Sequence, residues 1–149
     1  MLPPDWQTID SLATLFIAVA QADAPVDRKE LDVIRARLEA LFAKAPPGRA
    51  DDAIQRAIEH LILQVVPGVE RSPWEWLQVH CRLLADVYGL EVLPSLVKIL
   101  ARVTRASGRA TAPEVELAAA IAAEWGLPDL AAAMRRQFRR AELRRIGKE

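Results

Sequence analysis

Capping residues, prolines and glycines flank almost every apolar stretch of this chain. These helix start and stop signals constrain its fold more than any other feature. Within each bracketed stretch, apolar residues recur at three- and four-residue steps, the spacing that lines one face of an α-helix. No stretch shows sustained alternation of apolar and polar residues, so we predict no β-sheet. The sequence therefore predicts an all-α fold, a bundle of about seven helices.

Proline and glycine mark where these helices begin and end. The residue before a proline is pushed out of helical geometry, and glycine releases the chain in a left-handed conformation. Gly89 should end one helix in this way, and Ser72 followed by Pro73 should begin another. We expect helices at about 5–21, 27–45, 51–66, 73–88, 94–107, 111–125 and 128–146.

Length and composition both favour one domain that spans residues 1–149. This is the usual size of a domain with its own apolar core, and 52% of the residues are hydrophobic. The 20 basic and 20 acidic side chains cancel, so the chain as a whole has no electrostatic bias toward nucleic acid or anionic membrane. Any such bias must be local.

The apolar and cysteine patterns favour a cytoplasmic protein without a membrane span. The most apolar run, Leu12 to Ala20, is far shorter than the roughly 20 residues that a membrane helix needs. Asp5 and Asp10 precede this run, where a secretory signal would carry basic residues. The single cysteine, Cys81, cannot form an internal disulfide, which suits a reducing compartment.

One helical hairpin has the same pattern as a later one. Asp27 and Glu30 have the spacing of a capping box, in which two side chains satisfy backbone N–H groups at a helix start. Thr111 and Glu114 repeat this spacing 84 residues later. A single hairpin cannot bury its own apolar faces, so two copies should pack together. We therefore predict an internal helix-turn-helix duplication with pseudo-two-fold symmetry.

The residues of these turns resemble a known family. The segment 19–31, which reads VAQADAPVDRKEL, is similar to the signature of the TerB tellurite-resistance family, an Ala-Asp-Gly turn followed by a Ser or Asp cap and a Glu. The segment 105–114, RASGRATAPE, is similar too. Ala24 stands where the family has glycine, and Ser107 stands where it has aspartate. The resemblance implies a TerB-like helical fold, a link to tellurite resistance and stress response, and divalent-metal binding at the acidic turns.

Three acidic residues near the first turn form the candidate metal site. Asp23, Asp27 and Glu30 would supply the hard oxygen ligands that Ca²⁺ or Mg²⁺ prefers. In the competing interpretation, Asp27 and Glu30 are occupied as helix caps and Asp23 is solvated. In the second copy, Thr111 caps equally well but carries no charge. The sequence thus predicts no cofactor, with a divalent cation at the first turn as the alternative.

The last predicted helix, at about 128–146, concentrates basic residues. Arg135, Arg136, Arg139 and Arg140 gather along one band, which could contact phosphate or an acidic partner. A solvated helix end is the competing interpretation, because basic residues suit a helix C-terminus. Few aromatic residues interleave with these arginines for base stacking, which argues against nucleic acid as the partner.

Catalytic signatures are missing from the sequence. His60, His80 and Cys81 are the residues that a nucleophile or a zinc site would use. Adjacent helix positions diverge by about 100°, so His80 and Cys81 cannot face one target, and we expect a buried thiol with surface histidines. We find no glycine-rich phosphate loop, nucleophile elbow or cofactor fingerprint, so we predict no enzyme.

The sequence therefore predicts a non-enzymatic, TerB-like interaction or regulatory module with a protein partner. Its contact surface would be the basic terminal helix or an exposed apolar groove. A divalent-metal binder that uses the first acidic turn is the first alternative. A hydrolase without a recognisable motif is the second, because catalytic groups can converge in space alone.

Overall fold

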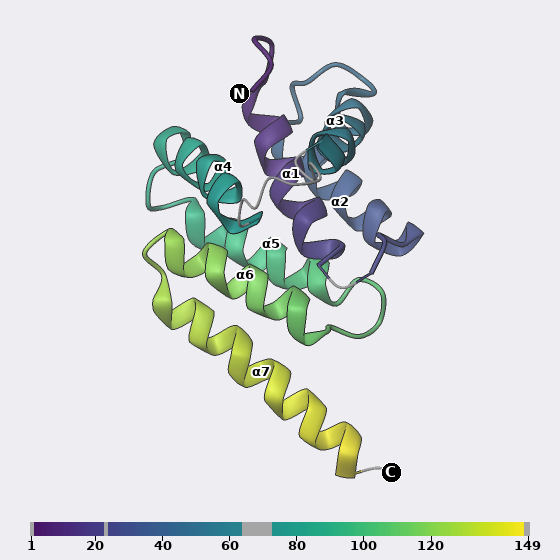
Figure 1. Ribbon diagram of the computed structural model, residues 1–149, viewed down its shortest axis with the longest axis vertical. Coiled ribbons are helices and arrows are strands. Elements are labelled where there is room, and N and C mark those ends of the chain that lie inside the picture. Colours follow the sequence, from purple (N-terminus) through teal and green to yellow (C-terminus); the bar gives the residue numbers. More distant parts are fainter. Residues whose placement is uncertain (1, 23, 64–72, 148–149) are drawn as a thin grey trace.

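The computed structural model describes residues 2–22, 24–63 and 73–147, and the regular structure in these ranges is entirely helical. The prediction of an all-α bundle of about seven helices is confirmed (Figure 1). The helices of the described chain are α1 (Thr8–Ala20), α2 (Arg28–Leu41), α3 (Arg49–Leu63), α4 (Pro73–Val87), α5 (Leu93–Thr104), α6 (Ala112–Glu124) and α7 (Pro128–Gly147).

Helix α1 forms the centre of the bundle (Figure 1). It contacts each of the helices α2 to α6, and every residue from Ile9 to Ala20 is buried. Leu12, Phe16 and Ile17 have no exposed surface at all. A helix that is apolar on every side is stable only when other elements enclose it. The composition of α1 therefore fixes its place at the core.

The α5–α6 hairpin packs against the α1–α2 hairpin. Both α5 and α6 contact α1, and α5 also contacts α2. Leu96, Leu100 and Ile121 are fully buried or nearly so in this layer. The helices of the two predicted copies are therefore neighbours in the bundle. The duplication itself stays a prediction.

Two helices begin more than one residue away from the predicted position. Helix α1 begins at Thr8 and not near Asp5, because Gln7 caps it and the Asp10 carboxylate accepts a hydrogen bond from the Gln7 N–H at 2.9 Å. Helix α3 begins at Arg49, two residues early. Gly48 has φ +84°, and its carbonyl accepts the Asp52 N–H at 3.1 Å, so the first turn closes there.

The ends of the helices confirm the glycine prediction only in part. Gly126, which follows α6, is left-handed with φ +74°. Gly89 has no positive φ, so the prediction of a left-handed end to α4 is wrong. The Gly89 carbonyl instead accepts a hydrogen bond from the Val92 N–H at 3.1 Å, in a turn that leads into α5. The predicted cap Ser72 and the predicted stop at 67–68 lie outside the described residues.

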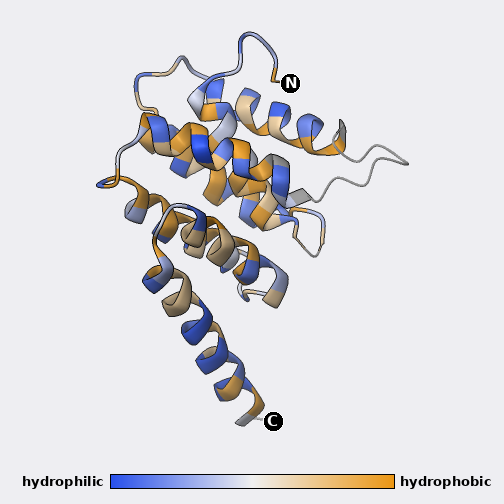
Figure 2. Cartoon of the chain, turned by 60° about the vertical axis from the view of Figure 1, so that its left-hand side comes forward, coloured by the Kyte–Doolittle hydropathy of each residue, from blue (hydrophilic) through white to orange (hydrophobic). Residues whose placement is uncertain are grey.

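Helix α7 lies at the edge of the bundle. It packs mainly on α6, and its C-terminal end projects beyond the other helices (Figure 1). Hydrophilic residues cover much of this projecting end (Figure 2). Ala131 and Met134 are its buried residues, and both belong to its first half. Within the described ranges, no helix is long and apolar enough to cross a membrane.

Candidate functional site

The first predicted turn forms a helix cap. The Asp27 side chain accepts the Glu30 N–H at 2.8 Å, and the Glu30 Oε1 accepts the Asp27 N–H at 3.1 Å. Both carboxylates are thus occupied by backbone donors, as the competing interpretation of this turn predicts. Asp23, the third predicted metal ligand, lies outside the described residues.

The second predicted turn forms the same kind of cap. The Glu114 Oε1 accepts the Thr111 N–H at 3.1 Å and the Thr111 hydroxyl at 2.7 Å. Each capping box therefore uses one carboxylate oxygen of its glutamate. The second oxygen, Oε2, belongs to no cap in either box.

The glutamates of the two capping boxes meet in the interior. Glu30 is 4% exposed and Glu114 is 2% exposed, and their side chains form a hydrogen bond with each other. Burial raises the pKa of Glu114 to about 7, and the charge of Glu30 acts in the same direction, while the Thr111 hydrogen bonds act against it. Two carboxyl groups in this arrangement share a proton near neutral pH. We call them the glutamate pair.

The sequence pattern does not predict the glutamate pair. Glu30 falls in the candidate metal site of the first turn, and Glu114 falls in the capping box of the second. The repeated capping box is a usable signal, because in the predicted duplication equivalent residues close to the pseudo-two-fold axis would lie near each other. In the described part of the chain, no group of three or more His, Cys, Asp or Glu side chains could hold a metal ion.

The four predicted partner-binding arginines lie on α7, and we call them the basic band. Arg136, Arg139 and Arg140 are exposed, and in the described part of the chain none of them has an ion pair. Arg135 is less exposed because its guanidinium lies 3.2 Å from the Glu116 carboxylate on α6. Three members of the band thus present their charge to solvent.

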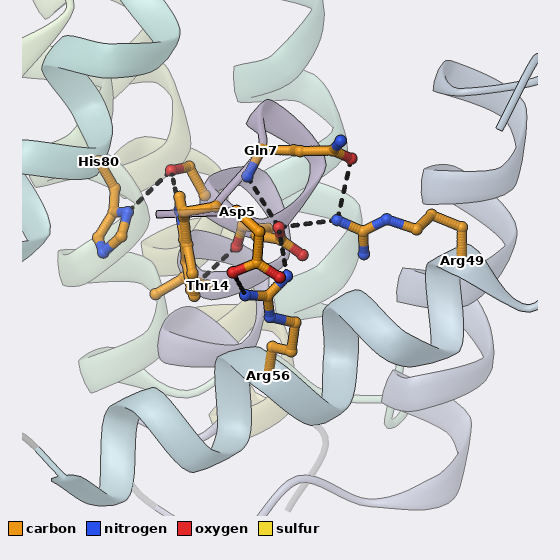
Figure 3. Close-up of polar contacts among 9 residues, drawn as sticks. Asp5, Gln7, Thr14, Arg49, Arg56 and His80 are labelled. Atoms are coloured by element: carbon orange, nitrogen blue, oxygen red, sulfur yellow. Dashed lines mark hydrogen bonds and ion pairs between the residues drawn. The ribbon is translucent and has the colours of Figure 1, made fainter. Parts of the chain in front are cut away.

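His80 lies in a buried polar cluster beside α1 (Figure 3). His80 is only 1% exposed, so the expectation of surface histidines is wrong for this residue. The His80 Nδ1 lies 3.0 Å from the Ser11 hydroxyl, which also accepts the Trp6 indole N–H at 2.8 Å. The ring of His60 lies 5.4 Å from that of His80. Burial lowers the pKa of His80 to about 4, and the nearby His60 acts in the same direction.

A buried carboxylate, Asp10, lies in the first turn of α1. Asp10 has no exposed surface, and its Oδ2 lies 2.7 Å from the guanidinium of Arg49 and 3.4 Å from that of Arg56. The other terminal nitrogen of the Arg56 guanidinium, Nη2, pairs with Asp5 at 2.7 Å (Figure 3). These ion pairs join α1 and the N-terminal segment to α3. Their geometry holds the helices in register and leaves the Asp10 carboxylate enclosed.

Cys81 is a buried thiol, as predicted. It has no exposed surface, and burial raises its pKa to about 12. A thiol with such a pKa is a poor nucleophile near neutral pH, because the thiolate is the reactive form. Its backbone carbonyl accepts the Trp125 indole N–H at 2.9 Å, which joins α4 to the end of α6.

Comparison of the chain with protein-family models, with curated proteins and with solved structures found no match. The resemblance to TerB therefore stays a prediction that rests on the two turn segments.

Proposed function

We propose that this chain is a non-enzymatic interaction module that binds an acidic protein segment through the basic band of α7. The observation that carries the proposal is the exposure of Arg136, Arg139 and Arg140 without ion pairs in the described part of the chain. The chain has balanced charge overall, so this band is a local excess of positive charge. Exposed positive charge of this kind attracts a partner of opposite sign.

The surroundings of the band support a protein partner. Leu143 is 69% exposed and Ile146 is 60% exposed. Both follow Arg139 at steps of four and seven residues, so the three side chains lie on one side of α7. A surface that combines arginine with exposed apolar side chains is typical of protein interfaces. Aromatic residues for base stacking are not found on this side of the described helix.

The position of α7 supports the same proposal. The C-terminal end of the helix extends past α5 and α6, so a partner could approach it without displacing the core (Figure 1). The resemblance to TerB would connect such a module with tellurite resistance or stress response, as a regulatory component without catalytic activity of its own.

The test is a charge reversal in the band. The triple variant Arg136→Glu, Arg139→Glu, Arg140→Glu should bind a labelled amphipathic Glu/Leu peptide at least 10-fold more weakly than the wild type does. Fluorescence anisotropy at two salt concentrations measures this binding, and the salt dependence should fall in the variant because fewer charge contacts form.

The matched control reverses three charges elsewhere. Arg28→Glu, Lys29→Glu and Lys98→Glu give the same net charge on exposed positions of α2 and α5. Equal losses of peptide binding in the two triple variants would contradict the proposal. Stronger binding to phosphatidylglycerol vesicles than to the peptide would also overturn it, because the band would then be a membrane-binding surface.

The glutamate pair favours a second candidate function, binding of a divalent cation. Two adjacent carboxylates can replace their shared proton with Ca²⁺ or Mg²⁺, for which carboxylate oxygens are the preferred ligands. This candidate differs from the predicted set of Asp23, Asp27 and Glu30 because its second carboxylate comes from Glu114. Calorimetric titration of metal-free protein with Ca²⁺, Mg²⁺ and Zn²⁺ tests it. Heat that Glu30→Gln abolishes supports the candidate, and no heat above the buffer control eliminates it.

A further inference from the structure

A cavity of about 240 Å³ lies between α5, α6 and α7, on the side of α7 that faces the bundle. Val115 and Met134 form buried parts of its wall, and the half-buried ring of Phe138 extends this wall. Ala101 and Ala110 contribute small side chains that leave the space open. The interior of the cavity is therefore mostly apolar. We call it the α5–α7 pocket.

The charged residues of the α5–α7 pocket are mainly arginines. Arg105, Arg109 and Arg145 line it, and Glu142 is the acidic residue among its lining side chains. Glu142 is shared, since its carboxylate lies 3.3 Å from the Arg109 guanidinium and 3.0 Å from that of Arg145. These guanidiniums lower the pKa of Glu142, with the hydrogen bond from Arg145 as the largest cause. The lining of the pocket thus holds three positive groups and one negative group, and two of the positive groups pair with the negative one.

We propose that the α5–α7 pocket binds a small monocarboxylate whose compact apolar body fills the cavity while its carboxylate pairs with the arginines. The apolar wall recognises the body through its burial from water. The arginines recognise the carboxylate, for which guanidinium is the best-matched side chain.

The volume of the pocket limits the size of this ligand. An engineered cavity of about 150 Å³ holds one benzene molecule, whereas pockets for drug-sized ligands measure about 300–1,000 Å³. The α5–α7 pocket lies between these values. An eight-carbon chain or a single ring with a short acid arm is therefore the expected ligand. Octanoate and 3-phenylpropionate represent these two shapes.

The pocket and the basic band lie on opposite sides of α7. Met134, Phe138, Ala141 and Arg145 follow each other at three- and four-residue steps and line the pocket. Arg139 lies about 100° around the helix from Phe138, and Arg136 and Arg140 point further away still. None of these three band arginines lines the pocket. This proposal therefore stands apart from the proposed function, and each can fail alone.

The test compares each acid with the alcohol of the same shape. Titration of labelled protein with octanoate or 3-phenylpropionate, followed by NMR, should shift the Met134 methyl signal in a saturable way. Octanol and 3-phenylpropanol should bind at least 10-fold more weakly. Equal affinity of acid and alcohol, or no saturable shift with either acid, would overturn the proposal.

Two variants with opposite expected effects separate a carboxylate site from a merely apolar one. Arg109→Gln should weaken octanoate binding at least fivefold. Glu142→Gln should tighten it severalfold, because Arg109 and Arg145 then lose the carboxylate that competes with the ligand. Arg144→Gln, next to Arg145 but outside the pocket, should leave the affinity unchanged and serves as the control. Weaker binding in the Glu142→Gln variant would contradict the assignment, provided that its thermal melting shows a folded protein.

The carboxylate could come from a free acid or from the C-terminus of a peptide. Acetyl-Leu-Phe and its C-terminal amide distinguish these sources in the same titration. Tighter binding of octanoate assigns the site to small acids, and tighter binding of the peptide acid than of both its amide and octanoate assigns it to chain ends. Either result supports the carboxylate site, whereas equal binding of the peptide acid and its amide, without octanoate binding, overturns it.

Discussion

The carboxyl groups of Glu30 and Glu114 form a hydrogen bond in the interior, although the two residues begin different helices. Each glutamate also closes the capping box of its own helix, so one side chain serves a local and a long-range contact together. A pair of buried carboxyls is stable with one proton between them and strained with none. The start of α2 and the start of α6 are therefore coupled through a single ionisation.

Glu114→Gln should stabilise the protein at pH 8 and leave its stability almost unchanged at pH 5. The raised pKa, about 7, means that the folded state binds more protons than the unfolded state between pH 4.5 and 7. Wild-type stability therefore falls as the pH rises through this window. An amide removes this loss and can donate to Glu30, so we expect a gain of about 1–2 kcal/mol at pH 8.

Urea unfolding at both pH values measures this gain, with Glu39→Gln as the control. Glu39 is an exposed carboxylate on α2, the same helix as Glu30, so its amide should change little at either pH. Destabilisation by Glu114→Gln at pH 8 as well as at pH 5 would show that the pair is fully ionised and satisfied in the folded state.

The buried imidazole of His80 should make the protein sensitive to acid. Its pKa is lowered to about 4, so between pH 6.5 and 4 the unfolded state binds a proton that the folded state does not. Stability is complete above this window and is lost as the pH falls through it, by an amount on the order of 3 kcal/mol.

The variant His80→Gln isolates this contribution. Its free energy of unfolding should be lower than that of the wild type at pH 7, and the difference should shrink or reverse at pH 4.5. Both proteins contain the glutamate pair, whose effect on stability has the opposite pH dependence. Its contribution therefore cancels in the difference between variant and wild type. His60→Gln reports separately on the second, less buried imidazole. A constant difference from pH 7 to pH 4.5 would contradict a lowered pKa at His80.

The sequence predicts features that depend on neighbouring residues, such as helix caps. It does not predict features that depend on how distant helices pack together. The caps at Asp27 and Thr111 depend on residues three positions apart, and both formed as predicted. The sequence predicts His80 at the surface, although it lies three residues after Leu77 and four before Leu84, on the side of α4 that is buried. Its burial comes from contacts with Trp6 and Ser11, about seventy residues earlier in the chain. The α5–α7 pocket likewise needs three helices to be placed before it exists.

One long-range contact can be predicted from the sequence. The repeat of the capping boxes relates Glu30 to Glu114, and the pairing of equivalent residues could have been predicted from it. Gly89 shows the opposite case, because glycine after a helix allows a left-handed end but does not require one. The nearby start of α5 instead selects the turn that the chain adopts there.

Cys81 should resist alkylation until the protein unfolds. A pKa of about 12 leaves roughly a thousandfold less thiolate at pH 8 than an ordinary cysteine has, and the side chain is completely buried. Labelling with iodoacetamide at pH 8, followed by mass spectrometry, should be at least a thousandfold slower in buffer than in 8 M urea. Labelling in buffer at a rate near that in urea would show that α4 separates readily from the core.

The ion pair between Asp10 and Arg49 should contribute more to stability than an exposed pair of the same type. Asp10 is fully buried and the Arg49 side chain is 15% exposed, so neither loses much of the interaction to solvent. Removal of one partner leaves the other charge buried, which costs about 3–5 kcal/mol. A double-mutant cycle with Asp10→Ala and Arg49→Ala should therefore give a coupling energy of about 2 kcal/mol or more.

The pair Arg35–Asp51 is the matched comparison, because it also joins an arginine to an aspartate but lies at the surface, with side chains 38% and 59% exposed. Its coupling energy should stay below about 1 kcal/mol, since water screens exposed charges and the long side chains lose conformational freedom. Both cycles use urea unfolding in the same buffer. Equal coupling energies for the two pairs would mean that the Asp10 region is hydrated in solution, and the enclosed ion pair would then no longer explain how α3 is held against α1.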